Sequence, residues 1–209
     1  MALFKPAYTA IRSYSPNIVV ISSGLAPSDT TAVSINDRDY LRQMYQSGLS
    51  NYDVRIGVHP FGWGNPPDVR CCNKVDGQGW DDKQQFFFLD TLADYRQIML
   101  SYGHRNAKLW STEFGWGSWD GFAGAPPEGW MTYNTTAKQA DYNLKAFQIG
   151  QALGFVDNMF LWNLNFANAI NVNNGVEMAA YSLLTVDGSQ NVTARASFDT
   201  FVTLRRQMQ

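Results

Sequence analysis

The segment Ala-Lys-Leu-Trp-Ser-Thr-Glu at positions 107–113 is followed by Phe-Gly-Trp at positions 114–116. Its apolar residues predict a buried β-strand, and the glycine after it predicts that the strand passes into a loop. Glu113 therefore stands at the carboxyl end of a strand, where a carboxylate without a partner is costly to bury. We expect Glu113 to be a catalytic residue; the alternative is a structural carboxylate that pairs with an arginine or caps the next loop.

Three other segments have the composition of β-strands. Together with residues 107–113 they make four predicted strands, and the segments between them have apolar residues at helical spacing. Residues 18–21 form a continuous β-branched run, residues 53–59 end at His59, and residues 156–164 include Met-Phe-Leu-Trp. Helices are predicted over residues 5–14, 37–46, 84–102, 135–150 and 194–206. Strands that alternate with helices indicate βαβ units and a parallel sheet, so the predicted fold class is α/β. No linker or exact repeat divides residues 1–209, which are predicted to form one domain.

The tryptophans lie mainly outside the predicted core. The chain has seven, and only Trp110 falls well inside a predicted strand. The other six lie in loops after strands or near the end of the last strand: Trp63, Trp80, Trp116, Trp119, Trp130 and Trp162. Because the apolar face of a sugar ring packs well on an aromatic ring, we expect at least two of the six to stack on a carbohydrate, with Trp116 and Trp162 first and Trp63 as a further candidate. Packing of the long loops against each other is the alternative.

Polar residues close the other predicted strands. Ser23 follows the first strand, His59 ends the second, and Asn163 lies at the end of the fourth. Enzymes of the α/β class build their sites beyond the carboxyl ends of the strands, so these three residues are predicted to bind substrate beside Glu113. The expected role of His59 is a hydrogen bond to the nucleophile or to a sugar hydroxyl, whereas a satisfied core histidine is the alternative.

Composition and charge exclude several classes of function. The formal net charge is −2 and no basic stripe is visible, which argues against nucleic-acid binding. No apolar run is long enough to span a membrane. The adjacent residues Cys71 and Cys72 are expected to be free thiols, because neighbours rarely reach disulfide geometry. Without a Cys/His cluster, no metal or other cofactor is expected. The first residues do not form a signal peptide, and the compartment is not predicted.

Four strand motifs, in order along the chain, resemble those of clan A glycoside hydrolases, which are (β/α)8 barrels. Residues 108–116 (Lys-Leu-Trp-Ser-Thr-Glu-Phe-Gly-Trp) resemble the nucleophile motif of the seventh strand. Residues 57–62 resemble the sixth strand, residues 159–163 the eighth, and residues 21–27 the fifth strand of bacterial relatives of family 39 and cellulase-type members. The resemblance implies a partial TIM barrel of about four βα units, strands five to eight, so that residues 1–209 form a single C-terminal half-barrel.

The resemblance also implies a retaining mechanism for cleavage of O-glycosidic bonds. Glu113 would attack the anomeric carbon, and a second carboxylic acid, roughly 5–5.5 Å away, would protonate the leaving group. Related enzymes carry that acid after an asparagine at the end of the fourth strand, but this sequence contains no Asn-Glu pair. Glu128 and Glu177 do not match the motif. Two functions therefore stay open: a glycoside hydrolase, or an inactive half-barrel that binds carbohydrate or assembles as a dimer.

A half-barrel has unpaired strand edges and exposes the face that would line the barrel interior. Pairing with a second copy, edge to edge, would complete a barrel with two-fold symmetry. A homodimer or a separate partner half-barrel is therefore expected, with a carbohydrate as the substrate. Helices that fold over the open face are the alternative.

Overall fold

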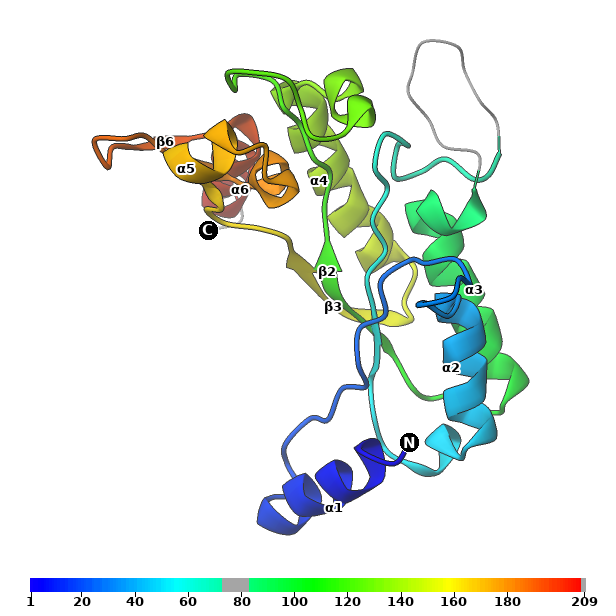
Figure 1. Cartoon of the computed structure of the whole chain (residues 1–209). Helices are drawn as coiled ribbons and strands as arrows, with labels where there is room; N and C mark the ends of the chain where they lie inside the picture. Colours follow the sequence, from blue (N-terminus) through cyan, green and yellow to red (C-terminus); the bar gives the residue numbers. More distant parts are fainter. Residues whose placement is uncertain (73–82, 208–209) are drawn as a thin grey trace.

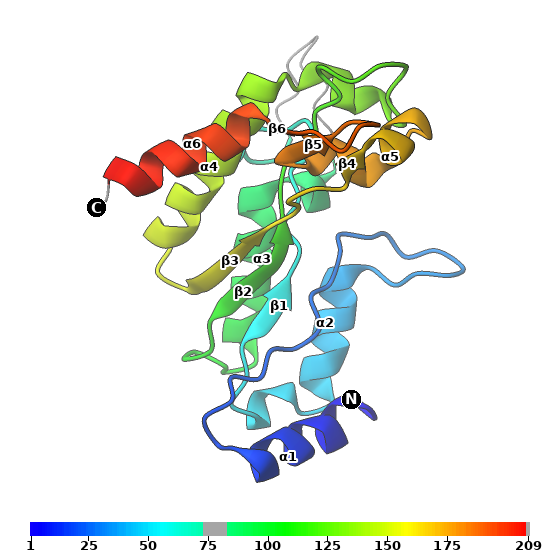
Figure 2. The ribbon, with the colours of Figure 1, turned by 90° about the vertical axis from the view of Figure 1, so that its left-hand side faces the viewer.

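The computed structural model describes residues 1–72 and 83–207, and it has the predicted mixed α/β architecture. A parallel sheet is built from β1 (Ile56–Val58), β2 (Leu109–Phe114) and β3 (Val156–Leu161), in that order. Figures 1 and 2 show α2 (Asp37–Gln46), α3 (Phe88–Ser101) and α4 (Thr136–Ala152) on one face of this sheet. The parallel order and the helices between the strands confirm the α/β prediction and are those of a partial α/β barrel.

Local sequence signals set the ends of these helices. The side chain of Asn36 accepts hydrogen bonds from the backbone N–H groups of Arg38 and Asp39, and Thr135 does the same for Lys138. Such caps satisfy N–H groups that have no partner inside the helix. The first helix, α1 (Phe4–Tyr14), lies near the amino ends of the strands (Figure 2). Its bounds agree closely with the helix predicted over residues 5–14.

The prediction of a regular strand over residues 18–21 is wrong. The segment is extended, but it meets β1 only through isolated parallel bridges, from Ile21 to Arg55 and from Leu25 to Val58. The side-chain oxygen of Ser22 accepts the backbone N–H of Gly57 at 3.0 Å, in the place of a backbone carbonyl. The ladder is therefore interrupted, although the segment still forms the edge of the sheet beside β1.

A β-bulge near the end of β2 changes the face of the sheet toward which its last side chains point. Ser111 lies opposite Met159 and Phe114 lies opposite Leu161, so β2 has one more residue than β3 between these points. Ser111 and Phe114 are both fully buried, and Phe114 packs on Phe147 of α4. Strict alternation would place residues three apart on opposite faces. The bulge instead keeps both on the helix side, a device common next to active sites.

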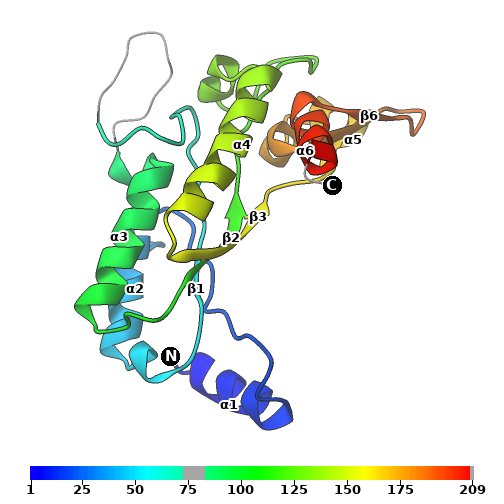
Figure 3. The same ribbon diagram turned by 180° about the vertical axis from the view of Figure 1, so that it is seen from behind.

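A second small sheet follows β3 and was not predicted. It consists of β4 (Ala167–Asn168), β5 (Leu184–Val186) and β6 (Val192–Ala194). The short helices α5 (Ala169–Asn173) and η4 (Glu177–Tyr181) lie between β4 and β5, and α6 (Ala196–Gln207) packs against α4 (Figure 3). Three further 3-10 turns are η1 (Leu49–Asn51), η2 (Gln84–Phe86) and η3 (Gly129–Tyr133). Strands of two or three residues carry too little periodicity to be found from sequence.

The face of the main sheet opposite the helices is open (Figure 2). Phe160 is 50% exposed and Val19 is 47% exposed. The indole N–H of Trp110 donates to Asp157 at 3.0 Å on this part of the sheet. The sheet thus exposes apolar side chains, and no helix of the described residues covers its open face (Figure 2).

Two further observations concern the cysteines and the helices. Cys71 and Cys72 are joined by a disulfide, so the prediction of free thiols is wrong. Within residues 1–72 and 83–207, no helix is both long and apolar enough to cross a membrane.

Candidate active site

Glu113 and His59 meet at the carboxyl ends of two adjacent strands. β1 and β2 pair in parallel, with Val58 opposite Ser111, so the residues just beyond these partners emerge at the same edge. The Nδ1 atom of His59 lies 3.6 Å from the Oε2 atom of Glu113. The two residues predicted to work together are therefore neighbours, at a distance slightly longer than a hydrogen bond.

The imidazole of His59 is in a partly desolvated position. Burial lowers the pKa of His59 below 6.5, and the negative charge of Glu113 opposes that shift without cancelling it. The ring is accordingly neutral at pH 7, and its contact with Glu113 is between a neutral ring and a carboxyl group rather than an ion pair.

An aromatic cavity of about 290 Å³ opens in front of Glu113. Its walls come from loops after several strands, and its lining residues are Ala26, Pro27, Phe61, Trp63, Glu113, Trp162, Glu177, Met178 and Tyr181. Three of the predicted site residues, Glu113, Trp63 and Trp162, are thus brought together. A concave site with aromatic walls and a few polar groups is the usual form of a small-molecule site.

Two aromatic residues in this cavity were not predicted from sequence. The rings of Phe61 and Tyr181 pack edge to face, with centroids 5.5 Å apart. Phe61 follows His59 by two residues, so its place after a strand was a usable signal. Tyr181 comes from η4, at the end of an irregular segment that has no sequence pattern pointing to the site.

Glu177 is a second carboxylate in the same cavity. Desolvation raises the pKa of Glu177, the nearby charge of Glu128 raises it further, and a hydrogen bond with Tyr181 acts in the opposite direction. The phenol of Tyr181 is buried, and burial also raises its pKa. Glu177 does not match the acid/base motif of the resembling enzymes, yet the fold places it in the same cavity as Glu113.

Trp116 does not face the cavity, and its predicted stacking role is wrong. Its side chain is fully buried and packs on Phe88 and Tyr142. Its indole N–H donates to the carbonyl of Asn65 at 2.8 Å. Trp119 is buried as well, and Trp80 lies outside the described residues. The ring of Trp116 therefore has no open face for a sugar.

Asn163 is a structural residue rather than a substrate ligand. It is 5% exposed, and its amide donates to the carbonyl of Met178 at 2.8 Å. Its side-chain oxygen accepts from the backbone N–H of Phe166 and from the hydroxyl of Ser182. These bonds tie the end of β3 to the small sheet, and the predicted binding role of Asn163 is wrong.

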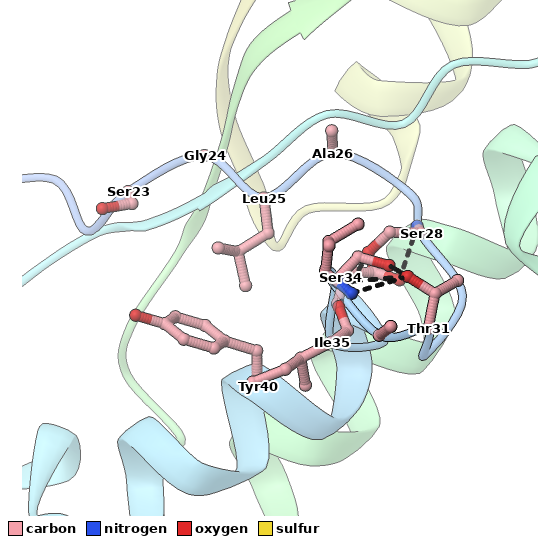
Figure 4. A pocket seen from close by; sticks show the side chains of 12 residues that line it. Ser23, Gly24, Leu25, Ala26, Ser28, Thr31, Ser34, Ile35 and Tyr40 are labelled. Atoms are coloured by element: carbon pink, nitrogen blue, oxygen red, sulfur yellow. Dashed lines mark hydrogen bonds between the residues drawn. The ribbon is translucent and has the colours of Figure 1, made fainter.

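Ser23 lines a different and larger hollow, of about 610 Å³, between residues 23–35 and the start of α2 (Figure 4). Tyr40 forms part of its floor. The carboxylate at this hollow is Asp37, which is 2% exposed, pairs with Arg38 at 2.9 Å and accepts from Tyr95 at 2.8 Å. Because Asp37 is fully engaged, the smaller cavity that contains Glu113 is the better candidate for catalysis. Ser23 does not share that cavity.

Replacing Glu177 by glutamine is expected to alter how stability depends on pH. The pKa of Glu177 in the fold is above its ordinary value of 4.5, so its protonation stabilises the fold at low pH. That contribution is lost as the pH rises through the folded pKa. The unfolding free energy of Glu177→Gln should therefore increase relative to wild type from about pH 4 to about pH 7. Urea unfolding across this range measures the difference, and a constant offset would contradict the expectation.

No cluster of His, Cys, Asp and Glu within residues 1–72 and 83–207 has the arrangement of a metal site. Two carboxyl groups and several aromatic rings line the cavity, and the imidazole of His59 lies beside Glu113.

Comparisons with known proteins identify a fold rather than a family. No protein-family model matches the sequence, and no curated protein matches it. The structure is similar to a family 39 glycoside hydrolase from the gut symbiont Bacteroides cellulosilyticus, with a TM-score of 0.62 and 16% identity. The match covers 94% of this chain and 35% of that enzyme, so the chain spans about a third of the enzyme's length.

Two further matches are lower in structural similarity. A β-1,3-glucanase and allergen of Cryptomeria japonica pollen has a TM-score of 0.43 and 18% identity over 86% of this chain and 56% of that one. A β-glucuronidase from Ruminococcus gnavus has a TM-score of 0.39 and 16% identity over 73% of this chain and 22% of that one. The family 39 match alone is strong enough to describe the fold as glycoside hydrolase-like.

Proposed function

We propose that the cavity in front of Glu113 is the active site of a retaining glycoside hydrolase, in which Glu113 is the nucleophile. The observation that carries the proposal is the position of Glu113 at the bulged end of β2, within an aromatic cavity and 3.6 Å from His59. The glycoside hydrolase-like fold and the motif at residues 108–116 support it. On this proposal the chain corresponds to the C-terminal half of a clan A barrel.

The residues of the cavity have distinct roles in this reaction. A carboxylate oxygen of Glu113 forms a bond to the anomeric carbon while the bond from that carbon to the leaving oxygen breaks. Water then attacks the same carbon, releasing the sugar and regenerating the Glu113 carboxylate. Trp63 and Trp162 offer apolar faces to the sugar ring, and His59 holds the nucleophile in place.

The general acid is the unassigned part of this mechanism. Glu177 shares the cavity with Glu113 and has a raised pKa, as a proton donor requires, but it does not match the acid/base motif of the clan. Substrates with good leaving groups need little protonation. Activated aryl glycosides therefore test the nucleophile independently of the acid.

Covalent trapping tests the proposal directly. An aryl 2-deoxy-2-fluoro glycoside with a good leaving group should add one fluorosugar to the wild-type chain, and peptide mass spectrometry should locate it on Glu113. A panel of gluco, galacto, xylo and glucurono probes covers the unknown sugar specificity. Asp141→Asn, which changes an exposed carboxylate outside the cavity, should still be labelled. Labelling at another residue, or equal labelling of Glu113→Gln, would overturn the assignment.

The open sheet face favours a second proposal, an assembly role. Phe160 and Val19 are half exposed, and one face of the main sheet carries no helix (Figure 2). Within the described residues, no further strand pairs with β3 or with the extended segment that is bridged to β1. We propose that a second copy or a partner half-barrel pairs with these edges. Light scattering on the purified 209-residue chain should give the mass of a dimer. A monomeric mass at micromolar concentration would contradict self-pairing.

A further inference from the structure

Gly24, His59 and Thr112 come from three neighbouring segments and lie close together. A Cβ atom added to Gly24 would lie closer than 3.0 Å to the Oγ1 atom of Thr112 and to the Nε2 and Cδ2 atoms of His59. Such approaches are not tolerated by real side chains. Gly24 therefore leaves open the space that the hydroxyl of Thr112 and the ring of His59 both face.

The hydroxyl of Thr112 is buried and has no use elsewhere in the fold. Its Oγ1 atom has no hydrogen-bond partner within residues 1–72 and 83–207. Buried hydroxyl groups without a partner are rare because their desolvation is costly. The polar atom that faces the same gap is Nε2 of His59, while the other ring nitrogen, Nδ1, faces Glu113.

We infer that Thr112 is a positioning residue. The two side chains are not hydrogen-bonded in the structure, but both face the gap at Gly24, and a small rotation of the hydroxyl or of the ring lets Thr112 donate to Nε2 of His59. That bond would hold the ring with its proton on Nδ1, directed at Glu113. The inference deepens the proposed function and rests on it for its catalytic meaning. It adds a residue, a tautomer and a direction of hydrogen bonding to that site.

Electrostatics selects this tautomer over the alternative. A neutral imidazole carries one N–H, and the nitrogen without it presents a lone pair. With the proton on Nδ1, a donor points at the Glu113 carboxylate and the lone pair of Nε2 accepts from Thr112. With the proton on Nε2, a lone pair would face an anion 3.6 Å away. The partner of one ring nitrogen thus sets the state of the other.

For catalysis, the consequence is that the His59 ring holds the carboxylate of Glu113 in one orientation. A donor on Nδ1 fixes the Oε2 atom of Glu113, leaving the other oxygen to attack. Small errors in the placement of a nucleophile cost rate rather than binding. Loss of the Thr112 hydroxyl should therefore lower kcat more than it changes KM.

Nuclear magnetic resonance tests the tautomer without any need for activity. The chain contains two histidines, His59 and His104, so long-range ¹H–¹⁵N correlation spectra of the rings at pH 7.5 are simple to assign. His59 should show a protonated Nδ1 and an unprotonated Nε2. His104, whose Nδ1 contacts the hydroxyl of Tyr45 at 3.0 Å, is the internal control.

Two variants of Thr112 separate the effect of its hydroxyl group from the effect of its packing. Thr112→Val has nearly the same shape without the hydroxyl, and the ring nitrogens of its His59 should move toward the averaged shifts of a tautomer mixture. Thr112→Ser keeps the hydroxyl and should retain the wild-type pattern. His104 should be unchanged in both. A wild-type His59 protonated on Nε2, or a Thr112→Val spectrum identical to wild type, would overturn the inference.

The kinetic readout separates this inference from the proposed function. If the wild-type chain hydrolyses an aryl glycoside, Thr112→Val should lower kcat about tenfold with little change in KM. If the chain hydrolyses none of the glycosides tested, the proposed function fails. The tautomer and its dependence on Thr112 would still be decided by the spectra.

Discussion

Glu113→Gln is expected to hydrolyse an activated aryl glycoside at least about 10³-fold more slowly than the wild-type chain, because an amide cannot form the glycosyl-enzyme bond. The side chain of Glu113 is one-third exposed in the cavity, and glutamine has nearly the same shape. The fold should therefore survive the change. Initial rates with a dinitrophenyl glycoside measure the loss, and a urea unfolding curve confirms that the variant is folded.

The matched control is Asp141→Asn, which removes one carboxylate charge from an exposed position of α4 outside the cavity. Its rate should stay within a factor of about two of wild type, as expected for a surface substitution. Equal rates for Glu113→Gln and the wild-type chain would remove Glu113 from the mechanism. A loss restricted to Glu113→Gln would locate the chemistry at the end of β2, whatever residue serves as the acid.

The position of Glu113 was predicted from sequence, but its orientation could not be. Alternation along β2 starting from the buried Leu109 would put Ser111 and Glu113 together on the helix side. The bulge reverses this, because Phe114 takes the helix side in place of Glu113. A bulge depends on register with the neighbouring strand, which a single sequence does not contain.

The sequence also does not show which of the loop tryptophans face the cavity. Trp63 and Trp162 line the cavity, whereas Trp116 is buried although it lies in the same kind of loop. The difference is the partner of the indole N–H: Trp116 finds the carbonyl of Asn65 inside the core. Which loop tryptophan is satisfied internally depends on how long loops fold back, and no local pattern reports it.

Asn163 failed as a prediction for the same reason. An asparagine at the end of a strand is compatible with a ligand or with a structural bridge, and its three hydrogen bonds in the fold make it a bridge. Its partners lie in segments after β3 that are too short and irregular to be foreseen. His59 does lie beside Glu113, because the two residues end adjacent strands whose order was predicted; its role stays a prediction.

Gly24→Ala is expected to destabilise the fold by about 1–3 kcal/mol, the cost of overpacking a tight site. The new Cβ would overlap the Thr112 hydroxyl and the ring of His59. Backbone displacement is restricted here, because Ser22 and Leu25, on either side, are hydrogen-bonded to β1 and to His59. The ring of His59 must therefore turn away from Glu113. Urea unfolding measures the loss of stability, and the same variant should lose activity on an aryl glycoside.

Two other glycines provide the control. Gly129→Ala and Gly188→Ala place the same methyl group in open space, with no heavy atom within 4 Å of the new Cβ. Neither should cost stability, and a small gain is expected because alanine restricts the unfolded chain. A loss of similar size at all three positions would mean that the cost is a general backbone effect.

A double-mutant cycle identifies which neighbour resists the new methyl group. His59→Ala removes the ring atoms that Gly24→Ala would overlap, so the cost of Gly24→Ala should fall in the His59→Ala background. Residues in contact commonly couple by about 0.5–3 kcal/mol. Independent costs in the two backgrounds would show that Gly24 does not hold its space open for His59. A positive coupling energy would show that the lack of a side chain at Gly24 is what allows the ring of His59 to lie beside Glu113.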